Sequence, residues 1–364
     1  MKILLAIPSM SIGGAERFVT MLARELAGRG HEITIVAPPG ELDEDLHDVG
    51  HVRIAIDDHG RDLRGAPGSV LRLAGVIRSV QPDVIHAQNP RYTGIVRAAS
   101  IVGSPGRRTP LLATFHGAPP AEYRRAALLL RLANHVACVS DAVLEGIVRA
   151  GLPPARASLV RNGIQILPPL DRASREALDR ELGLGEEPVV AIVGRLVTPK
   201  AHERFVVAAQ LLTQARPQVR CLIVGDGPRR SEIERCVAEA GIADRVLFTG
   251  SRSDATDIIA RIQLLVFSSD SEGLSIAALE ALAAGTPVVS TDVEGMRELL
   301  AGGAGAIVAL DDGTALGEQL IALLDDEPKR LEMGRTGREL VAREFSLEAM
   351  IDSYVSLYER LTCD

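Results

Sequence analysis

Two glutamates eight residues apart, Glu272 and Glu280, lie in the stretch of the sequence with the clearest potential for chemistry. The apolar run 264–267 before them predicts a buried strand. The run 276–284, rich in Ala, Leu and Glu, predicts a helix that a following glycine and proline end. Both acids would then lie near the carboxyl end of a strand, where open parallel sheets bind their ligands.

The start of this predicted helix is suited to an anion. Ser275 can cap the helix by accepting a hydrogen bond from a backbone N–H of the first turn. The N–H groups of Leu274, Ser275 and Ile276 would then face the preceding loop, with the positive end of the helix dipole behind them. We therefore predict that an anion binds at this end of the helix.

A pair of cations lies on a second loop that follows a predicted strand. Arg195 and Lys200 are five residues apart and come after the predicted strand 188–193. An arginine can bind a diphosphate through its forked N–H groups, and a lysine can bind it as a point charge. Lys200 is one of three lysines in a sequence that otherwise uses arginine. A diphosphate site is the preferred interpretation, and a solvated surface pair is the alternative.

The N-terminal half offers further residues of this kind. Gly13 and Gly14 follow the predicted first strand and open a helix, so the backbone there can approach a ligand closely. His116 follows another predicted strand and offers a hydrogen bond, or a proton near neutral pH. His86 lies near the end of a third strand. For His116 a purely structural hydrogen bond is the alternative, whereas for His86 a buried ring with structural hydrogen bonds is the preferred interpretation and a place near the acceptor is the alternative.

Composition limits the class of protein. The 364 residues suffice for two domains, and 46% hydrophobic with 3% aromatic residues predicts aliphatic cores. No apolar run approaches the length of a membrane span, and the first residues are predicted to form a strand rather than an export signal. The four cysteines lack the spacing of a metal site or a disulfide framework. We therefore expect a cytoplasmic protein without a metal site.

Charge is distributed unevenly along the chain. Residues 1–170 contain 19 Arg and Lys against 15 Asp and Glu, a net charge of +4. The remaining residues contain 21 against 33, a net charge of −12. The basic half could attract an anionic membrane surface or an anionic acceptor. Arginines that simply cover exposed helix faces are the alternative.

The stretch around the two glutamates resembles the EX7E signature of retaining glycosyltransferases of the GT-B fold, most of all family 4. Glu272 and Glu280 would be the two acids of that signature. Six other segments resemble family motifs: GGAE at 13–16, DVIHAQN at 83–89, TFHG at 114–117, LVRNGI at 159–164, GRLVTPK at 194–200 and GDGP at 225–228. The resemblance covers almost the whole chain, and the sequence departs from the family pattern at Gln88, Gln165 and Ala201.

This resemblance implies a role for each candidate site residue. Glu272 and His116 would be the catalytic residues, and the donor sugar would be held by Glu272, Gly273 and Leu274. The donor diphosphate would be bound by Arg195, Lys200, Gly13, Gly14, Leu274, Ser275 and Ile276, and the ribose and nucleotide by Glu280, Gly225, Asp226 and Gly250. The acceptor would meet His86, Tyr123 and Arg124.

Strands alternate with helices along the chain, which predicts an α/β protein with two doubly wound parallel sheets. By resemblance this is the GT-B fold, in which two Rossmann-like domains have the active cleft between them. We predict an acceptor-side domain over residues 1–167 and a nucleotide-sugar-binding domain over residues 168–345. The C-terminal helix, about 346–364, should pack back on the first domain.

The resemblance implies that a hexose-type sugar is moved, with retention, from a nucleoside diphosphate donor to a glycan, lipid-linked or small-molecule acceptor. A UDP-sugar is favoured as donor, and GDP-mannose comes next. Such an enzyme would serve cell-surface polysaccharide or glycolipid synthesis, without cofactor, metal or nucleic acid, in the cytoplasm or peripherally at the inner face of the membrane. A sugar-nucleotide 2-epimerase of GT-B architecture and a non-catalytic nucleotide-sugar-binding subunit are the alternatives.

Overall fold

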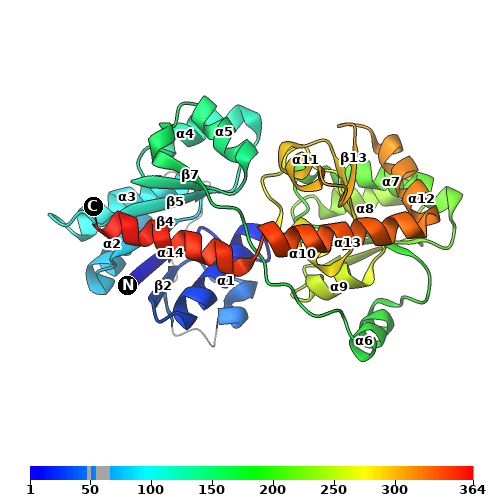
Figure 1. Ribbon diagram of the computed structural model, residues 1–364, viewed down its shortest axis with the longest axis horizontal. Helices are drawn as coiled ribbons and strands as arrows, with labels where there is room; N and C mark the ends of the chain where they lie inside the picture. The colour runs from blue at the N-terminus through cyan, green and yellow to red at the C-terminus, as the bar shows by residue number, and fades with distance from the viewer. Residues whose placement is uncertain (47–50, 55–65, 364) are drawn as a thin grey trace. The chain divides into compact units, whose positions relative to one another are not determined.

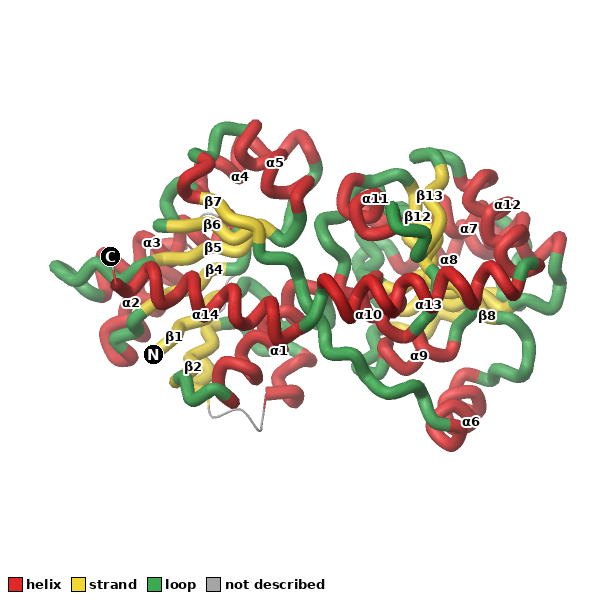
Figure 2. Tube along the Cα trace, viewed as in Figure 1, coloured by secondary structure: helices red, strands yellow, loops and turns green. Residues whose placement is uncertain are grey.

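The computed structural model describes residues 1–46, 51–54 and 66–363, and the chain divides into two compact units (Figure 1). The N-terminal unit contains Met1–Asn162 together with the C-terminal segment from Leu347. The C-terminal unit contains Gly163–Ser346. In both units helices flank a parallel sheet, as Figure 2 shows. No helix of the described residues is long and apolar enough to span a bilayer.

The N-terminal unit is built on a seven-stranded parallel sheet in the order β3-β2-β1-β4-β5-β6-β7. Its strands are β1 Lys2–Ala6, β2 Glu32–Val36, β3 His51–Ile54, β4 Val84–Ala87, β5 Leu111–Phe115, β6 His135–Cys138 and β7 Ala157–Leu159. Ile3 to Ala6 are fully buried, because helices cover both faces of the sheet. The strand order reverses between β1 and β4, which makes the carboxyl end of β1 a topological switch point.

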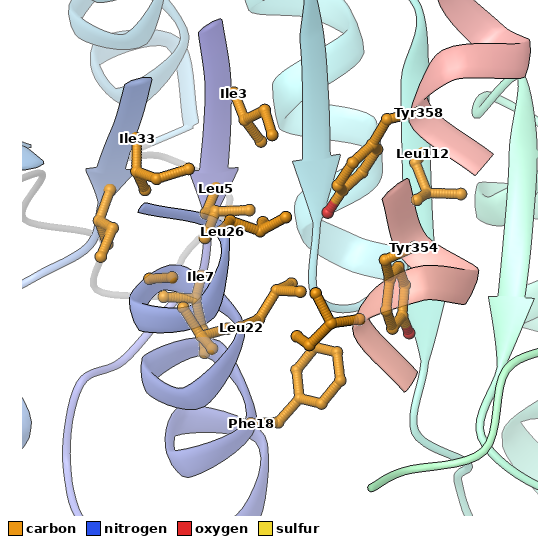
Figure 3. Packing of buried hydrophobic residues seen from close by; sticks show 14 of the residues in the cluster. Ile3, Leu5, Ile7, Phe18, Leu22, Leu26, Ile33, Leu112, Tyr354 and Tyr358 are labelled. Atoms are coloured by element: carbon orange, nitrogen blue, oxygen red, sulfur yellow. The ribbon is translucent and has the colours of Figure 1, made fainter. Parts of the chain in front are cut away.

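The helices of this unit are α1 Gly14–Gly28, α2 Ala66–Val80, α3 Pro90–Gly103, α4 Tyr123–Leu130, α5 Asp141–Arg149 and α14 Leu347–Cys363. α1 buries Phe18, Leu22 and Leu26, which are four residues apart and therefore share one face of the helix. α14 contacts α1 and β4, and its Tyr354 and Tyr358 complete the same core (Figure 3). The C-terminal helix thus belongs to the N-terminal unit.

The C-terminal unit is built on a six-stranded parallel sheet in the order β10-β9-β8-β11-β12-β13. Its strands are β8 Val189–Val193, β9 Arg220–Val224, β10 Val246–Gly250, β11 Leu264–Phe267, β12 Val288–Thr291 and β13 Gly305–Val308. Its helices are α6 Arg172–Leu182, α7 His202–Ala215, α8 Arg230–Glu239, α9 Ala255–Arg261, α10 Ile276–Ala284, α11 Glu294–Leu300, α12 Gly313–Asp325 and α13 Glu327–Glu344. The predicted pair of doubly wound parallel sheets is confirmed.

The helix predicted at 276–284 is α10, and it is apolar on most of its surface. It packs against α9 and α13, so both its sides are covered. It begins at the carboxyl end of β11, beside the switch point between β8 and β11. The loop that connects β11 to α10, residues 268–275, is called the donor loop below.

Candidate active site

The start of α10 has the geometry that the sequence predicts. The Ser275 hydroxyl accepts a hydrogen bond from the Ala278 N–H at 3.4 Å. Gly285 ends the helix in the left-handed conformation, with φ of 81°. The first-turn amides of α10 are therefore oriented toward the donor loop, at the positive end of the helix dipole.

The structure brings Glu272 and Lys200 together, although 72 residues separate them. Lys200 Nζ lies 2.6 Å from Glu272 Oε1, and the Ser269 hydroxyl donates to the same oxygen at 2.5 Å. The Glu272 side chain is 9% exposed and that of Lys200 is 26% exposed. The carboxylate predicted to meet the donor sugar and the cation predicted to meet the diphosphate thus form one ion pair.

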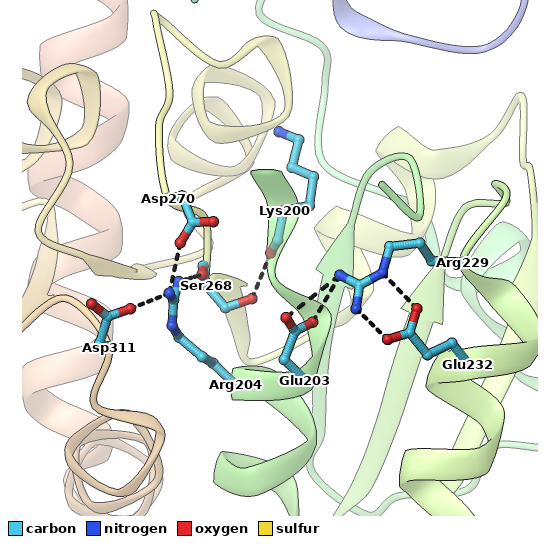
Figure 4. Close-up of polar contacts among 8 residues, drawn as sticks. All are labelled: Lys200, Glu203, Arg204, Arg229, Glu232, Ser268, Asp270 and Asp311. Atoms are coloured by element: carbon cyan, nitrogen blue, oxygen red, sulfur yellow. Dashed lines mark hydrogen bonds and ion pairs between the residues drawn. The ribbon is translucent and has the colours of Figure 1, made fainter. Parts of the chain in front are cut away.

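Backbone contacts fix the donor loop against the segment that carries Lys200. The Ser268 hydroxyl donates to the Lys200 carbonyl at 2.9 Å, and the Asp270 N–H donates to the Pro199 carbonyl at 2.8 Å. Figure 4 shows the Ser268 contact beside the surrounding ion pairs. On its other side the donor loop meets Gly295 of α11, where an added Cβ would lie 1.3 Å from a loop carbonyl oxygen. Both neighbours therefore constrain the position of Glu272.

Arg195 lies on the loop that follows β8, as predicted. Its side chain is exposed, and in the part of the chain that the structure describes it pairs with no carboxylate. The preceding Gly194 has φ of 157°. Arg195 therefore offers an exposed cation on the loop that also carries Lys200.

Gly225 and Gly250 are brought together at the carboxyl ends of β9 and β10. The Gly225 N–H donates to the Gly250 carbonyl at 2.8 Å. Gly225 has φ of 138°, and an added Cβ would lie 2.1 Å from the Gly194 carbonyl oxygen, so only glycine fits. The Asp226 carboxylate is occupied within its own turn by the Gly227 N–H at 2.7 Å and by Arg230 at 3.0 Å. In this arrangement Asp226 stabilises the turn.

Glu280 is half-buried in the second turn of α10 and lines a cavity of about 570 Å³. The other walls come from residues 164–171, from the start of α6, from α9, from the end of α10 and from Arg338 of α13. The described residues that line this cavity include neither Gly225 nor Gly250. Glu280 thus lies on the wall of a cavity of the C-terminal unit, in the second turn of α10.

His116 is half-buried at the end of β5. Its Nε2 lies 3.2 Å from Gln88 Oε1, and its ring packs edge-on against Phe18 with centroids 5.1 Å apart. Burial lowers the pKa of His116 to about 4. The lowered pKa favours the neutral ring, so of the two roles predicted for His116 it favours the hydrogen bond over donation of a proton.

His86 lies in the core of the N-terminal unit. It is 0% exposed, and its Nδ1 and Nε2 are each 2.7 Å from a hydroxyl, those of Tyr358 and Thr114. Burial lowers the pKa of His86 to about 3, and the nearby His116 adds to this effect. This geometry supports the preferred structural interpretation of His86 rather than contact with the acceptor, because a fully buried ring with both nitrogens bonded offers no accessible surface.

The remaining predicted residues lie at helix starts of the N-terminal unit. Gly13 is the extended N-cap residue of α1, and Gly14 is exposed. Tyr123 opens α4 and packs edge-on against Phe115 at 5.4 Å, whereas Arg124 is exposed. The positions of Gly13 and Gly14 are compatible with a backbone that lies near a ligand. The positions of Tyr123 and Arg124 are compatible with a polar surface.

Two residues of the site were missed from the sequence. Ser269 donates to Glu272, and Arg204 in the first turn of α7 binds Asp270 and the Ser268 carbonyl. The spacing of four residues between Lys200 and Arg204 was the available signal. Among the described residues, no group of three His, Cys, Asp or Glu side chains is arranged to hold a metal ion.

Comparison with known proteins gives matches in both units. Residues 12–166 match the family described as Glycosyltransferase Family 4, and residues 174–340 match Glycosyl transferases group 1. The D-inositol 3-phosphate glycosyltransferase of Gordonia bronchialis is 31% identical over 397 residues, covering 96% of this chain and 84% of the relative. The lipopolysaccharide core biosynthesis glycosyltransferase LpsE of Rhizobium meliloti is 27% identical over 350 residues, covering 95% of each chain.

Solved structures show the same fold. That of Anabaena HepE in complex with UDP-glucose matches with a TM-score of 0.87 at 21% identity, over 99% of this chain and 100% of that one. WaaG, a glycosyltransferase involved in lipopolysaccharide biosynthesis, matches with a TM-score of 0.79 at 19% identity, over 98% and 99% of the two chains. The predicted GT-B fold is thereby confirmed. The chain belongs to the group 1 glycosyltransferases and is an enzyme of that class.

Proposed function

We propose that the protein transfers a hexose-type sugar, with retention of its anomeric configuration, from a nucleoside diphosphate donor to a glycan, lipid-linked or small-molecule acceptor. The observation that carries this proposal is the pair of Lys200 and Glu272 beside the N-terminus of α10. A UDP-sugar is the favoured donor, and GDP-mannose is the second candidate. The UDP-glucose complex of HepE supports this choice only through the shared fold.

Donor binding is assigned to the carboxyl ends of the strands in the C-terminal unit. Arg195, Lys200 and the first-turn amides of α10 bind the diphosphate, because their positive charges and dipoles lie on neighbouring loops. Glu280 binds the ribose hydroxyls. Gly225 and Gly250, which are hydrogen-bonded to each other, let the nucleotide approach the backbone. From the N-terminal unit, Gly13 and Gly14 are assigned to the diphosphate.

In the reaction the bond between the anomeric carbon and the phosphate oxygen breaks, and its electron pair leaves with the diphosphate. Arg195 and Lys200 stabilise the negative charge that develops there. The acceptor hydroxyl attacks the anomeric carbon on the face that the diphosphate leaves, and its proton passes to a phosphate oxygen. Glu272 and the neutral His116 hold hydroxyls of the transferred sugar. The products are the glycoside and the nucleoside diphosphate.

We assign metal-independent activity to this site, because two cations and a helix N-terminus supply the positive charge that a divalent ion would otherwise supply. Turnover should be the same with EDTA present as with added Mg²⁺ or Mn²⁺. Activity that EDTA abolishes and only a divalent ion restores would overturn this assignment.

Membrane association through the N-terminal unit is part of the proposal. Leu128 of α4 and Leu132, two residues after its end, are 65% and 42% exposed, and Arg124, Arg125 and Arg131 are near them in the sequence. Apolar side chains among cations suit the surface of an anionic bilayer, such as the inner face of the cytoplasmic membrane. The protein should float with vesicles that contain phosphatidylglycerol but not with pure phosphatidylcholine vesicles.

A donor screen tests the proposed reaction. UDP-glucose, UDP-galactose, UDP-N-acetylglucosamine and GDP-mannose are each offered with candidate acceptors, and release of the nucleotide is followed. Proton NMR of the product then gives its anomeric configuration, which should match that of the donor. Conversion of a donor without any acceptor would favour the 2-epimerase. Donor binding without any turnover would favour a non-catalytic subunit.

A further inference from the structure

Arg204 holds three segments of the C-terminal unit together. Its side chain is 16% exposed and extends from the first turn of α7. It donates to the Ser268 carbonyl at 2.7 Å and to the Asp270 carboxylate at 2.6 Å, and it also binds the Asp311 carboxylate (Figure 4). One guanidinium therefore has acceptors from the donor loop and from the segment before α12.

The Ser268 and Asp270 contacts lie at the beginning of the donor loop, and Glu272 follows Asp270 by two residues. The same two loop residues also bond to the backbone of Lys200 and Pro199. The donor loop is thus tied twice to the segment before α7 and twice to the first turn of α7. With these ties in place, the Glu272 carboxylate lies 2.6 Å from Lys200 Nζ.

We infer that Arg204 is a positioning residue for the transfer reaction, acting by fixing the donor loop that carries Glu272 beside the segment that carries Lys200. This inference rests on the proposed function of Glu272. Arg204 itself touches neither the Glu272 carboxylate nor the Lys200 ammonium in the described contacts.

The forked guanidinium suits this task better than an ammonium would. It can donate in several fixed directions at once, whereas a lysine offers a single point charge. Asp270 and Asp311 both bind the same terminal nitrogen, so their negative charges converge on Arg204. Asp311 also adopts a left-handed conformation with φ of 67°, which is uncommon for residues other than glycine. Without Arg204 the two carboxylates would repel each other and release the loop.

A second arginine offers a matched control. Arg216 follows the other end of α7 and binds Asp325 at the end of α12, with Nε 3.0 Å from Oδ1. It therefore braces the same pair of helices as Arg204 but makes no described contact with the donor loop. Arg204→Met, Arg204→Lys and Arg216→Met are compared with the wild-type protein.

Two measurements separate positioning from general stability. Hydrogen exchange of the Asp270 amide, which reports local opening, should be at least about tenfold faster in Arg204→Met and unchanged in Arg216→Met. The kcat, measured as nucleotide release from the donor found in the screen, should be about tenfold or more lower in Arg204→Met than in the wild-type protein. The reason is that small displacements of reacting groups reduce the rate by large factors. UDP affinity and melting temperature should match those of Arg216→Met. For Arg204→Lys, both the exchange rate of the Asp270 amide and kcat should lie between those of the wild-type protein and those of Arg204→Met.

Equal exchange and equal kcat in the two methionine variants would overturn the inference. A lower kcat accompanied by a much lower melting temperature in Arg204→Met alone would overturn it too. The double variant Arg204→Met, Glu272→Gln should be no slower than Glu272→Gln, because Arg204 acts through Glu272. If Glu272→Gln keeps full activity, the proposed role of Glu272 fails. The hydrogen exchange of the Asp270 amide in Arg204→Met still tests separately whether Arg204 holds the donor loop.

Discussion

Replacing Glu272 with Gln should leave product nucleotide binding intact or make it tighter, although Glu272 belongs to the active site. Lys200 is paired with Glu272 at 2.6 Å, so a diphosphate that binds this ammonium competes with the carboxylate for it. A charge-assisted hydrogen bond contributes about 1.5–3 kcal/mol, and a neutral one about 0.5–1.5 kcal/mol. Removing the charge therefore lowers the cost of displacement by about 1 kcal/mol, or roughly fivefold in Kd.

Glu280→Gln should have the opposite effect. Glu280 lies five residues after the cap residue Ser275, which places it about 7.5 Å along α10 at a rise of about 1.5 Å per residue. A diphosphate at the helix end and a ribose beside the second turn are compatible with that spacing. Replacing the charged acceptor for ribose hydroxyls with a neutral one should weaken nucleotide binding by about 1 kcal/mol, or roughly fivefold.

Isothermal titration calorimetry with UDP and with GDP, beside single-turnover rates on the donor, measures both effects. We expect Glu272→Gln to lower the single-turnover rate severely while its Kd for the nucleotide stays equal or falls. A Glu272→Gln variant that loses the nucleotide as badly as Glu280→Gln would refute the assigned division between sugar and ribose. Melting temperatures of both variants serve as the control for folding.

Three further predictions test other parts of the site. Arg195→Ala and Lys200→Ala should each weaken UDP binding tenfold or more, since each loses a charge-assisted bond of about 1.5–3 kcal/mol; near-normal calorimetry in both would remove the diphosphate assignment. His202 is 0% exposed, its ring nitrogens have no partner in the described residues, and burial together with nearby positive charges lowers its pKa from 6.5 to about 4. The unfolded chain therefore binds a proton there that the folded chain does not, so stability is lost as pH falls from 6.5 toward 4. His202→Leu should reduce this loss in melting scans between pH 7.5 and 4.5, and an unchanged pH dependence would contradict the reasoning. Gly295→Ala should reduce both activity and melting temperature, because its Cβ would lie 1.3 Å from a donor-loop carbonyl oxygen, whereas Gly302→Ala, which meets nothing within 4 Å, should behave like the wild type.

Local chemistry made much of the fold predictable. α10 was predicted with the bounds that it has, because Ser275 caps its start, Gly285 ends it, and the residues between them favour a helix. The buried strands follow from short apolar runs whose ends carry polar or glycine residues. α3 was not predicted, although Asn89 caps it and Pro90 opens it, because β-branched residues and serine obscure its helical pattern.

The sequence by itself thus determined the two doubly wound sheets and the loops on which the candidate residues lie, because both depend on patterns between near neighbours. Only the tertiary structure decided which side chains meet. Glu272 pairs with Lys200, which lies 72 residues before it in the sequence. His86 is hydrogen-bonded to Tyr358, which lies 272 residues after it. Such partners depend on strand order and on the return of α14 to the first sheet, neither of which a local pattern encodes. The sequence left a functional and a structural interpretation open for each strand-end histidine. Only the packing of the tertiary structure showed that His86 lies in the core.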